Sequence, residues 1–227
     1  GLALEVLPSI YPPALQITFK RGRELFPLMI LQIPRRHPLS PSPPRLRFLS
    51  LPSLAWLPAV AVEGACGDPL RLEDFQGTYA VAGVDLSKAV DLTALVILIE
   101  RGGTIYAFAR FYMPAEKLEE ATARDGVPYR IYERRGILKL SGENHVDYSD
   151  VYADLLALVE QYEIYPLKVG YDRYSAHELV QALKAAGFHT DDVYQGDNLY
   201  PIIQQAYGLI CDGRINIGDN DLLKIHL

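Results

Sequence analysis

Three apolar stretches follow one another closely in the middle of the chain and have the composition of β-strands. The run Thr78–Ser87 (TYAVAGVDLS) has the pattern of a strand that ends in an acid. The run Leu92–Glu100 (LTALVILIE) is nearly all apolar, as expected for a strand that is covered on both faces. The break Arg101-Gly102-Gly103 predicts a tight hairpin into Thr104–Tyr112 (TIYAFARFY). We therefore expect three consecutive antiparallel strands.

Helical spacing replaces this pattern further along the chain. Residues 115–123 and 128–135 are rich in helix formers. Between Tyr148 and Tyr162 the apolar positions recur on one helical face, which predicts a helix that packs on the sheet.

A strand and helix pair is predicted next. Residues 167–171 (LKVGY) have the pattern of a short buried strand, and the capping box Ser175–Glu178 opens a helix that ends at Gly187. A strand at 192–194 and a helix from Leu199 to Ile210 complete the series. The order predicts an α/β fold with a mixed sheet, in which three antiparallel strands are followed by parallel strands, and helices on both faces.

Charge and proline divide the chain unevenly. Residues 1–58 contain 11 of the 16 prolines, seven Lys or Arg and two acids, so they carry about +5, and the remainder carries about −11. We expect residues 1–53 to be a proline-rich, basic and poorly ordered segment and residues 54–227 to form the folded domain.

The remaining composition excludes several classes of protein. Cys66 and Cys211 are the two cysteines, and neither lies at a spacing typical of a zinc site or a disulfide framework. The longest apolar runs, 25–33 and 54–62, are too short or too interrupted by proline to cross a bilayer, and no signal peptide is recognisable. We expect a cytoplasmic protein without a membrane partner.

The candidate chemistry lies where two strands end. Asp85 ends the first predicted strand and Asp172 follows the later one, each directly after apolar residues. Carboxylates are natural ligands for Mg²⁺ or Mn²⁺, and two such ions can clamp the attacking and leaving oxygens of a phosphodiester. A single aspartate after a strand is more commonly a turn or helix-cap residue, so this pattern alone leaves both interpretations open.

A series of short motifs, in order, resembles the nuclease domain of tailed-phage terminase large subunits. The series covers Trp56-Leu-Pro58, Cys66, Val84-Asp-Leu-Ser87, Asp91-Leu-Thr-Ala94, Gly126-Val-Pro-Tyr129, Gly136-Ile-Leu138, Val146-Asp-Tyr148, Tyr171-Asp-Arg173, Leu179-Val180, Leu183, Gly187-Phe188, Gln195-Gly196, Gly213-Arg-Ile215 and Leu222-Leu-Lys224. The resemblance extends over roughly residues 54–227.

This resemblance implies an RNase H-like fold and a two-metal endonuclease that cuts double-stranded, concatemeric DNA during genome packaging in the host cytoplasm. Asp85 and Asp172 fall on the first two metal-binding positions of the family, with Mg²⁺ or Mn²⁺ as the ions. Asp91 and Arg173 are secondary candidates, for the metals and for a phosphate. The implied protein partners are a portal and a small terminase subunit.

The sequence departs from the family pattern at both ends. The ATPase motor that precedes the nuclease in the family is not in this sequence, and the third acidic ligand of the family lies beyond the Leu-Leu-Lys motif, whereas the sequence stops at Leu227. On this basis we expect an incomplete carboxylate set, weak metal binding and little cleavage. The alternatives are a truncated or inactive prophage-derived interaction module and, less favoured, an actin-like ATPase domain.

Overall fold

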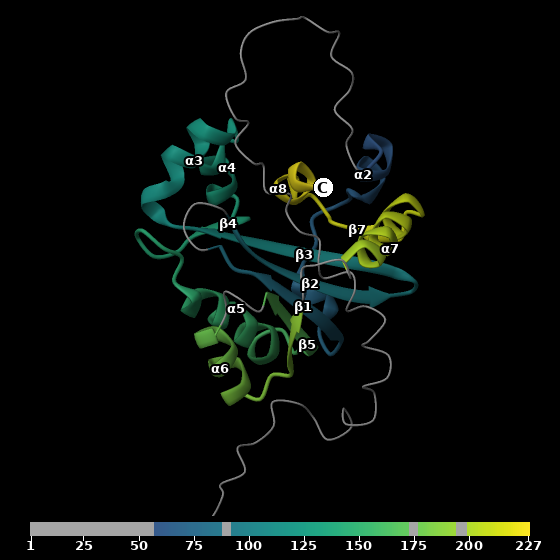
Figure 1. The fold of residues 1–227 in the computed structure, drawn as a ribbon. Coiled ribbons are helices and arrows are strands. Elements are labelled where there is room, and N and C mark those ends of the chain that lie inside the picture. The colour runs from purple at the N-terminus through teal and green to yellow at the C-terminus, as the bar shows by residue number, and fades with distance from the viewer. Residues whose placement is uncertain (1–56, 88–91, 173–176, 194–198) are drawn as a thin grey trace, which may run out of the picture.

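The computed structural model describes residues 57–87, 92–172, 177–193 and 199–227. Within them, one mixed sheet lies between two groups of helices (Figure 1). The strands are β1 (Tyr79–Asp85), β2 (Thr93–Arg101), β3 (Thr104–Met113), β4 (Leu138–Leu140), β5 (Tyr165–Asp172), β6 (Thr190–Val193) and β7 (Ile215–Asn216). The helices are α2 (Ala59–Ala65), η3 (Leu72–Phe75), η4 (Ala115–Lys117), α3 (Leu118–Asp125), α4 (Tyr129–Arg134), α5 (Tyr148–Glu160), α6 (His177–Ala185), α7 (Leu199–Cys211) and α8 (Asp221–His226).

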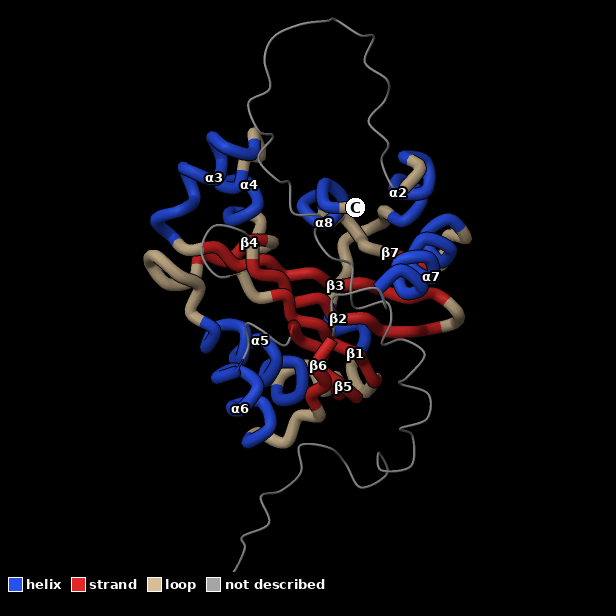
Figure 2. The backbone as a smooth tube through the Cα atoms, viewed as in Figure 1, coloured by secondary structure: helices blue, strands red, loops and turns tan. Residues whose placement is uncertain are grey.

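The sheet has the mixed topology that the pattern of elements predicts. Its strand order is β4-β3-β2-β1-β5-β6, and β7 also pairs with β3 (Figure 2). The first three strands are antiparallel, whereas β5, β6, β4 and β7 each pair in parallel with a neighbour. The expected three-stranded beginning and the later parallel strands are therefore confirmed.

The hairpin between β2 and β3 shows why this meander forms. Arg101 pairs with Thr104, so Gly102 and Gly103 make a two-residue turn, and both have positive φ angles, of 62° and 84°. Glycine adopts this left-handed backbone without steric cost, which suits the tight turn that twisted antiparallel strands need.

The two faces of the sheet bury separate hydrophobic cores. On one face, Val81, Val96 and Leu98 pack with apolar residues from α2, α3, α4, α7 and α8, and we call this side the α7 face. On the other, Ala82 and Leu95 pack with residues from α5 and α6, and we call this side the α5 face. Successive strand residues point to opposite sides, so each strand supplies both cores, which explains the uninterrupted apolar runs.

Several elements differ from the expectation in detail. The helix expected at 115–123 begins as the 3₁₀ turn η4 and continues as α3 to Asp125, and the strand expected at 192–194 begins earlier, at Thr190. The proposed capping residue Ser175 lies outside the described residues. Cys66 and Cys211 are both free thiols. Among the described helices, none is long and apolar enough to cross a membrane.

Candidate functional site

Asp85 and Asp172 end two neighbouring parallel strands. The ladder between β1 and β5 pairs Gly83 with Gly170 and Val84 with Tyr171. One step further in the same register are Asp85 and Asp172, the last residues of β1 and β5. Because adjacent strands lie about 4.8 Å apart, the register places the two acids at the same level on neighbouring strands.

Both acids belong to the α7 face. In β1 the alternation places Ala80, Ala82 and Val84 in the core of the α5 face, so Asp85 projects to the opposite side. In β5, Val169 lies in that same core, and Asp172 therefore shares the side of Asp85. Each acid is half-buried. The fold thus brings the two predicted residues together on one face, next to the carboxyl ends of β1 and β5.

A third carboxylate on this face is already paired. Asp191 in β6 lies opposite Gly170, and its Oδ2 is 2.6 Å from the Nζ of Lys168. Both lie on the same face as Asp172, because residues 168, 170 and 172 alternate together. Asp191 is level with Gly170, two residues before Asp172, and Lys168 is four residues before it. Sequence reasoning did not single out this ion pair, since neither residue ends a predicted strand.

Oxygen ligands from two carboxylates match the preference of hard divalent cations such as Mg²⁺ or Mn²⁺. Across the described ranges, no three His, Cys, Asp or Glu side chains come together as a group that could hold a metal ion. The secondary candidates Asp91 and Arg173 lie outside the described residues. The described donors for a cation are therefore Asp85 and Asp172.

A second polar cluster, which the sequence did not suggest, joins α5 to β3. The carboxylate of Asp154 accepts hydrogen bonds from Arg110 Nη1 and from the Tyr112 hydroxyl, both at 2.6 Å. Lys139 from β4 contacts the neighbouring Asp150 at 2.9 Å. Burial, and then the hydrogen bond to Asp154, raise the pKa of Tyr112 far above its usual value, so this hydroxyl remains a donor.

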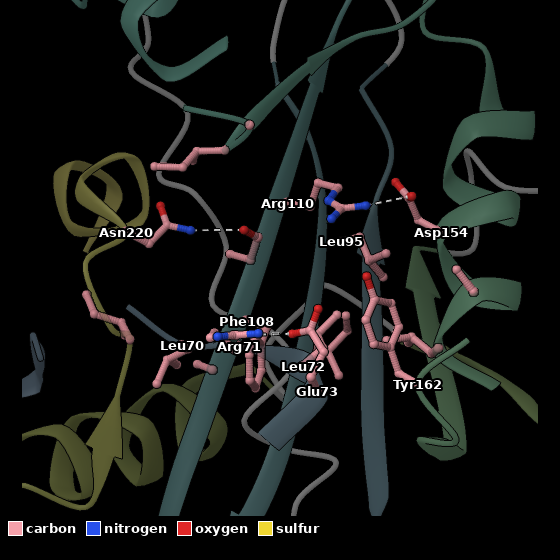
Figure 3. Close-up of a pocket in the computed structure, with 18 of the residues that line it drawn as sticks. Leu70, Arg71, Leu72, Glu73, Leu95, Phe108, Arg110, Asp154, Tyr162 and Asn220 are labelled. Carbon is pink, nitrogen blue, oxygen red and sulfur yellow. Dashed lines mark hydrogen bonds and ion pairs between the residues drawn. The ribbon is translucent and has the colours of Figure 1, made fainter. Parts of the chain in front are cut away.

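The cluster borders a cavity that is separate from the two acids. A cavity of about 600 Å³ opens beside β3, and Figure 3 shows Arg110 reaching Asp154 on one side of it and Asn220 on the other. Its lining includes Phe108 and Tyr162 but neither Asp85 nor Asp172. Because β2 separates β3 from β1, the cavity lies at a different part of the sheet from the candidate metal ligands.

Comparisons with known proteins identify the family to which the chain belongs. The family described as "Terminase large subunit, endonuclease domain" matches residues 54–227. The large terminase subunit of Enterobacteria phage HK97 is 31% identical over 148 residues, which cover 63% of this chain and 29% of that protein. The match thus covers less than a third of the length of this relative.

Solved structures include similar chains. The crystal structure of the HK97 bacteriophage large terminase has a TM-score of 0.64 and 28% identity, and the match covers 74% of this chain and 35% of that one. The large terminase nuclease from thermophilic phage G20c, solved with bound magnesium, has a TM-score of 0.43 and 16% identity, covering 72% and 75%. The match over most of the chain, together with the HK97 fold, shows that this chain belongs to the family of terminase large subunit endonuclease domains, which is RNase H-like.

Proposed function

We propose that this chain is a metal-dependent endonuclease domain that cleaves double-stranded DNA, with Asp85 and Asp172 as its metal-binding carboxylates. The observation that supports the proposal most directly is the register of β1 and β5, which carries the two acids to the same level on one face. Membership of the terminase nuclease family supplies the reaction class.

The two acids supply position and negative charge in this proposal. Two Mg²⁺ or Mn²⁺ ions would supply activation of a water molecule and neutralisation of the departing 3′ oxygen. Asp85 and Asp172 would hold the cations from neighbouring strand ends, for which their carboxylates should lie roughly 4 to 7 Å apart, a separation that a metal can bridge. The strands fix the acids on a rigid sheet, so little reorganisation accompanies metal binding.

The wider role follows from the same proposal. Within a complete terminase, the domain would cut concatemeric phage DNA during packaging in the host cytoplasm, with a portal and a small terminase subunit as partners. On this view the basic, proline-rich residues 1–53 stand apart from a nuclease domain over residues 54–227.

The first test replaces each acid by its uncharged amide. Asp85→Asn and Asp172→Asn keep side-chain volume but remove one ligand charge. We expect Mn²⁺ affinity to fall by about 100-fold or more and the low plasmid nicking of the parent chain to be lost, because even residues that only support metal ligands are worth 10- to 100-fold. Isothermal titration calorimetry with Mn²⁺ and nicking of supercoiled plasmid measure the two effects. Asp68→Asn, an exposed acid, makes the same change in net charge and should leave both unchanged.

The outcome can also contradict the proposal. If both amide variants bind Mn²⁺ as the parent chain does, Asp85 and Asp172 are not the metal ligands. If the parent chain binds no Mn²⁺ at millimolar concentration, the chain acts as a non-catalytic interaction module instead.

A further inference from the structure

Two polar side chains of the described residues are buried, and each hydrogen-bonds to backbone groups. Thr93 is 0% exposed and Ser141 is 2% exposed, and they are the buried polar residues within the described ranges. A buried hydroxyl costs free energy unless it is hydrogen-bonded, so its partners indicate what the burial achieves. Thr93 accepts from the backbone just after β1, and Ser141 binds the backbone of Asp147, the residue before Tyr148.

Thr93 and Tyr148 hold the residue that lies two positions after Asp85. The backbone N–H of Ser87 donates to Thr93 Oγ1 at 3.0 Å, and the Tyr148 hydroxyl donates to the backbone carbonyl of Ser87 at 3.0 Å. The two side chains come from β2 and from the start of α5. Both backbone polar groups of Ser87 are thus fixed by side chains of other elements.

The position of Tyr148 is itself fixed by the loop before α5. The Ser141 hydroxyl donates to the carbonyl of Asp147 and accepts from its N–H, both at 3.1 Å. Gly142 has a φ of 66°, and a Cβ on it would overlap the carbonyl oxygen of His145, so the turn requires glycine. The Tyr148 ring packs against the core of the α5 face, and burial raises the pKa of its hydroxyl, which stays a donor at neutral pH.

These contacts reach the chain from the side opposite the carboxylates. Thr93 shares the α5 face with Leu95, and Val84 and Leu86, on either side of Asp85, are buried in the same core. Asp85 projects to the opposite side, the α7 face. Thr93 and Tyr148 therefore hydrogen-bond the backbone from the α5 face, and the Asp85 side chain lies on the opposite face.

The backbone after Asp85 needs this support because the pairing of β1 with β2 does not extend beyond it. The pairing of β1 with β2 ends at Asp85 and Ala94, so regular sheet hydrogen bonds stop at the acid itself. Metal–oxygen distances in protein sites vary by only about 0.2 Å. A ligand at the end of a strand keeps to such distances only if the backbone next to it is fixed. Thr93 precedes Ala94, and its side chain accepts a hydrogen bond from Ser87, beyond the end of this ladder.

We propose that Thr93 and Tyr148 are positioning residues that fix the backbone after β1 and so hold the Asp85 carboxylate in place for a divalent cation. This inference rests on the proposed function, because it assumes that Asp85 is a metal ligand. It adds Thr93 of β2 and Tyr148 of α5 to the residues of the proposed metal site, and both act through the backbone of Ser87.

The test uses substitutions that remove single hydroxyl groups. Tyr148→Phe deletes the hydroxyl and keeps the ring, and Thr93→Val replaces the hydroxyl by a methyl group of similar size. We expect each to weaken Mn²⁺ binding about 10-fold in calorimetry, in the range found for residues that support metal ligands, and to raise the metal concentration needed for half-maximal nicking by the same factor. Thr93→Ser retains the acceptor and should restore binding to within about 2-fold.

A matched control separates positioning from general stability. Tyr129→Phe removes another tyrosine hydroxyl, which donates to Asp125 Oδ2 at 3.0 Å in a different part of the fold. Thermal unfolding of all variants, followed by circular dichroism, identifies any loss of structure, and titrations are run well below the lowest midpoint. We expect Tyr129→Phe to bind Mn²⁺ as the parent chain does.

The possible results distinguish this inference from the proposed function. If Asp85→Asn abolishes Mn²⁺ binding while Tyr148→Phe and Thr93→Val bind normally, the positioning role is wrong and the metal site stands. If Asp85→Asn binds Mn²⁺ normally, both are overturned. Equal weakening in Tyr129→Phe would also overturn the positioning role, because the effect would then reflect stability.

Discussion

Glu163 has a backbone conformation that is rare for its residue type. It is the residue other than glycine with a positive φ, 53°, within the described ranges. It lies between α5 and β5, and its carbonyl accepts a hydrogen bond from the N–H of Gly77, just before β1, at 3.0 Å. A left-handed backbone costs an L-residue about 1 kcal/mol or more, so this turn carries strain. The strained turn directs β5 into place beside β1.

Replacing Glu163 by glycine should stabilise the protein. Glu163→Gly removes the steric cost, partly offset by the greater freedom of glycine in the unfolded chain, and we expect a gain of about 0.5 kcal/mol. Glu163→Ala removes the same exposed side chain but keeps the Cβ, so it should give no gain. Urea denaturation of both variants measures the difference, and a glycine variant less stable than the alanine variant would contradict the strain argument.

At the scale of elements, the start of α5 organises the region around Asp85. Asp147 is the N-cap of α5, and its side chain accepts from the Ser149 N–H at 2.9 Å. A cap of this kind satisfies a backbone donor that the helix leaves unpaired. The side-chain and backbone hydrogen bonds from Ser149 hold the pKa of Asp147 below its usual value of 3.8. The helix that carries Tyr148 therefore depends on an ionised carboxylate.

This cap predicts a specific dependence of stability on pH. Because the folded pKa of Asp147 is lowered, its contribution is fully present above about pH 4 and is lost as the pH falls through the folded pKa. Asp147→Asn keeps an acceptor oxygen but cannot titrate. Relative to this variant, the parent chain should lose a few tenths of a kcal/mol of stability as the pH falls below about 4, because the carboxylate is exposed and solvent screens its interactions.

Chemical denaturation of the parent chain and Asp147→Asn at a series of pH values measures this difference. A constant difference across the acid range would show that the carboxylate contributes no more than the amide. Asp68→Asn, at an exposed acid outside this helix, controls for the loss of one negative charge.

At the scale of the whole molecule, the sheet joins its two cores through shared strands. Leu95 and Leu98 are both 1% exposed and lie three residues apart on β2, but Leu95 packs in the core of the α5 face and Leu98 in the core of the α7 face. The helices of the two faces surround the same strands (Figure 1). Loss of either core removes the support of one side of β2, so both should unfold together.

We expect Leu95→Ala and Leu98→Ala each to lower the free energy of unfolding by about 2 to 5 kcal/mol, the range for leucine truncation in a packed core. Val60→Ala, at a side chain that is 79% exposed, should change it by less than about 0.5 kcal/mol. Far-UV and near-UV circular dichroism should report one coincident transition in urea. Separate transitions in either leucine variant would show that the two faces unfold independently.

Local patterns in the sequence were sufficient to predict the first three strands and the helix α5. The apolar runs of β1, β2 and β3, the Gly102-Gly103 turn and the spacing of α5 each depend on neighbouring residues, and the structure confirms them. Strands β4 and β7 were not predicted, because segments of three and two residues have no periodicity of their own. They form where the chain returns to the edge of β3.

The sequence by itself determined that Asp85 and Asp172 end apolar strands, since that depends on the residues next to them. Only the tertiary structure decided that β5 lies beside β1 in a register that carries both acids to one level. The same holds for Thr93 and Tyr148, which are 55 positions apart in the numbering and meet at Ser87. Contacts between distant segments depend on the closure of the whole sheet, and no local pattern of residues encodes them.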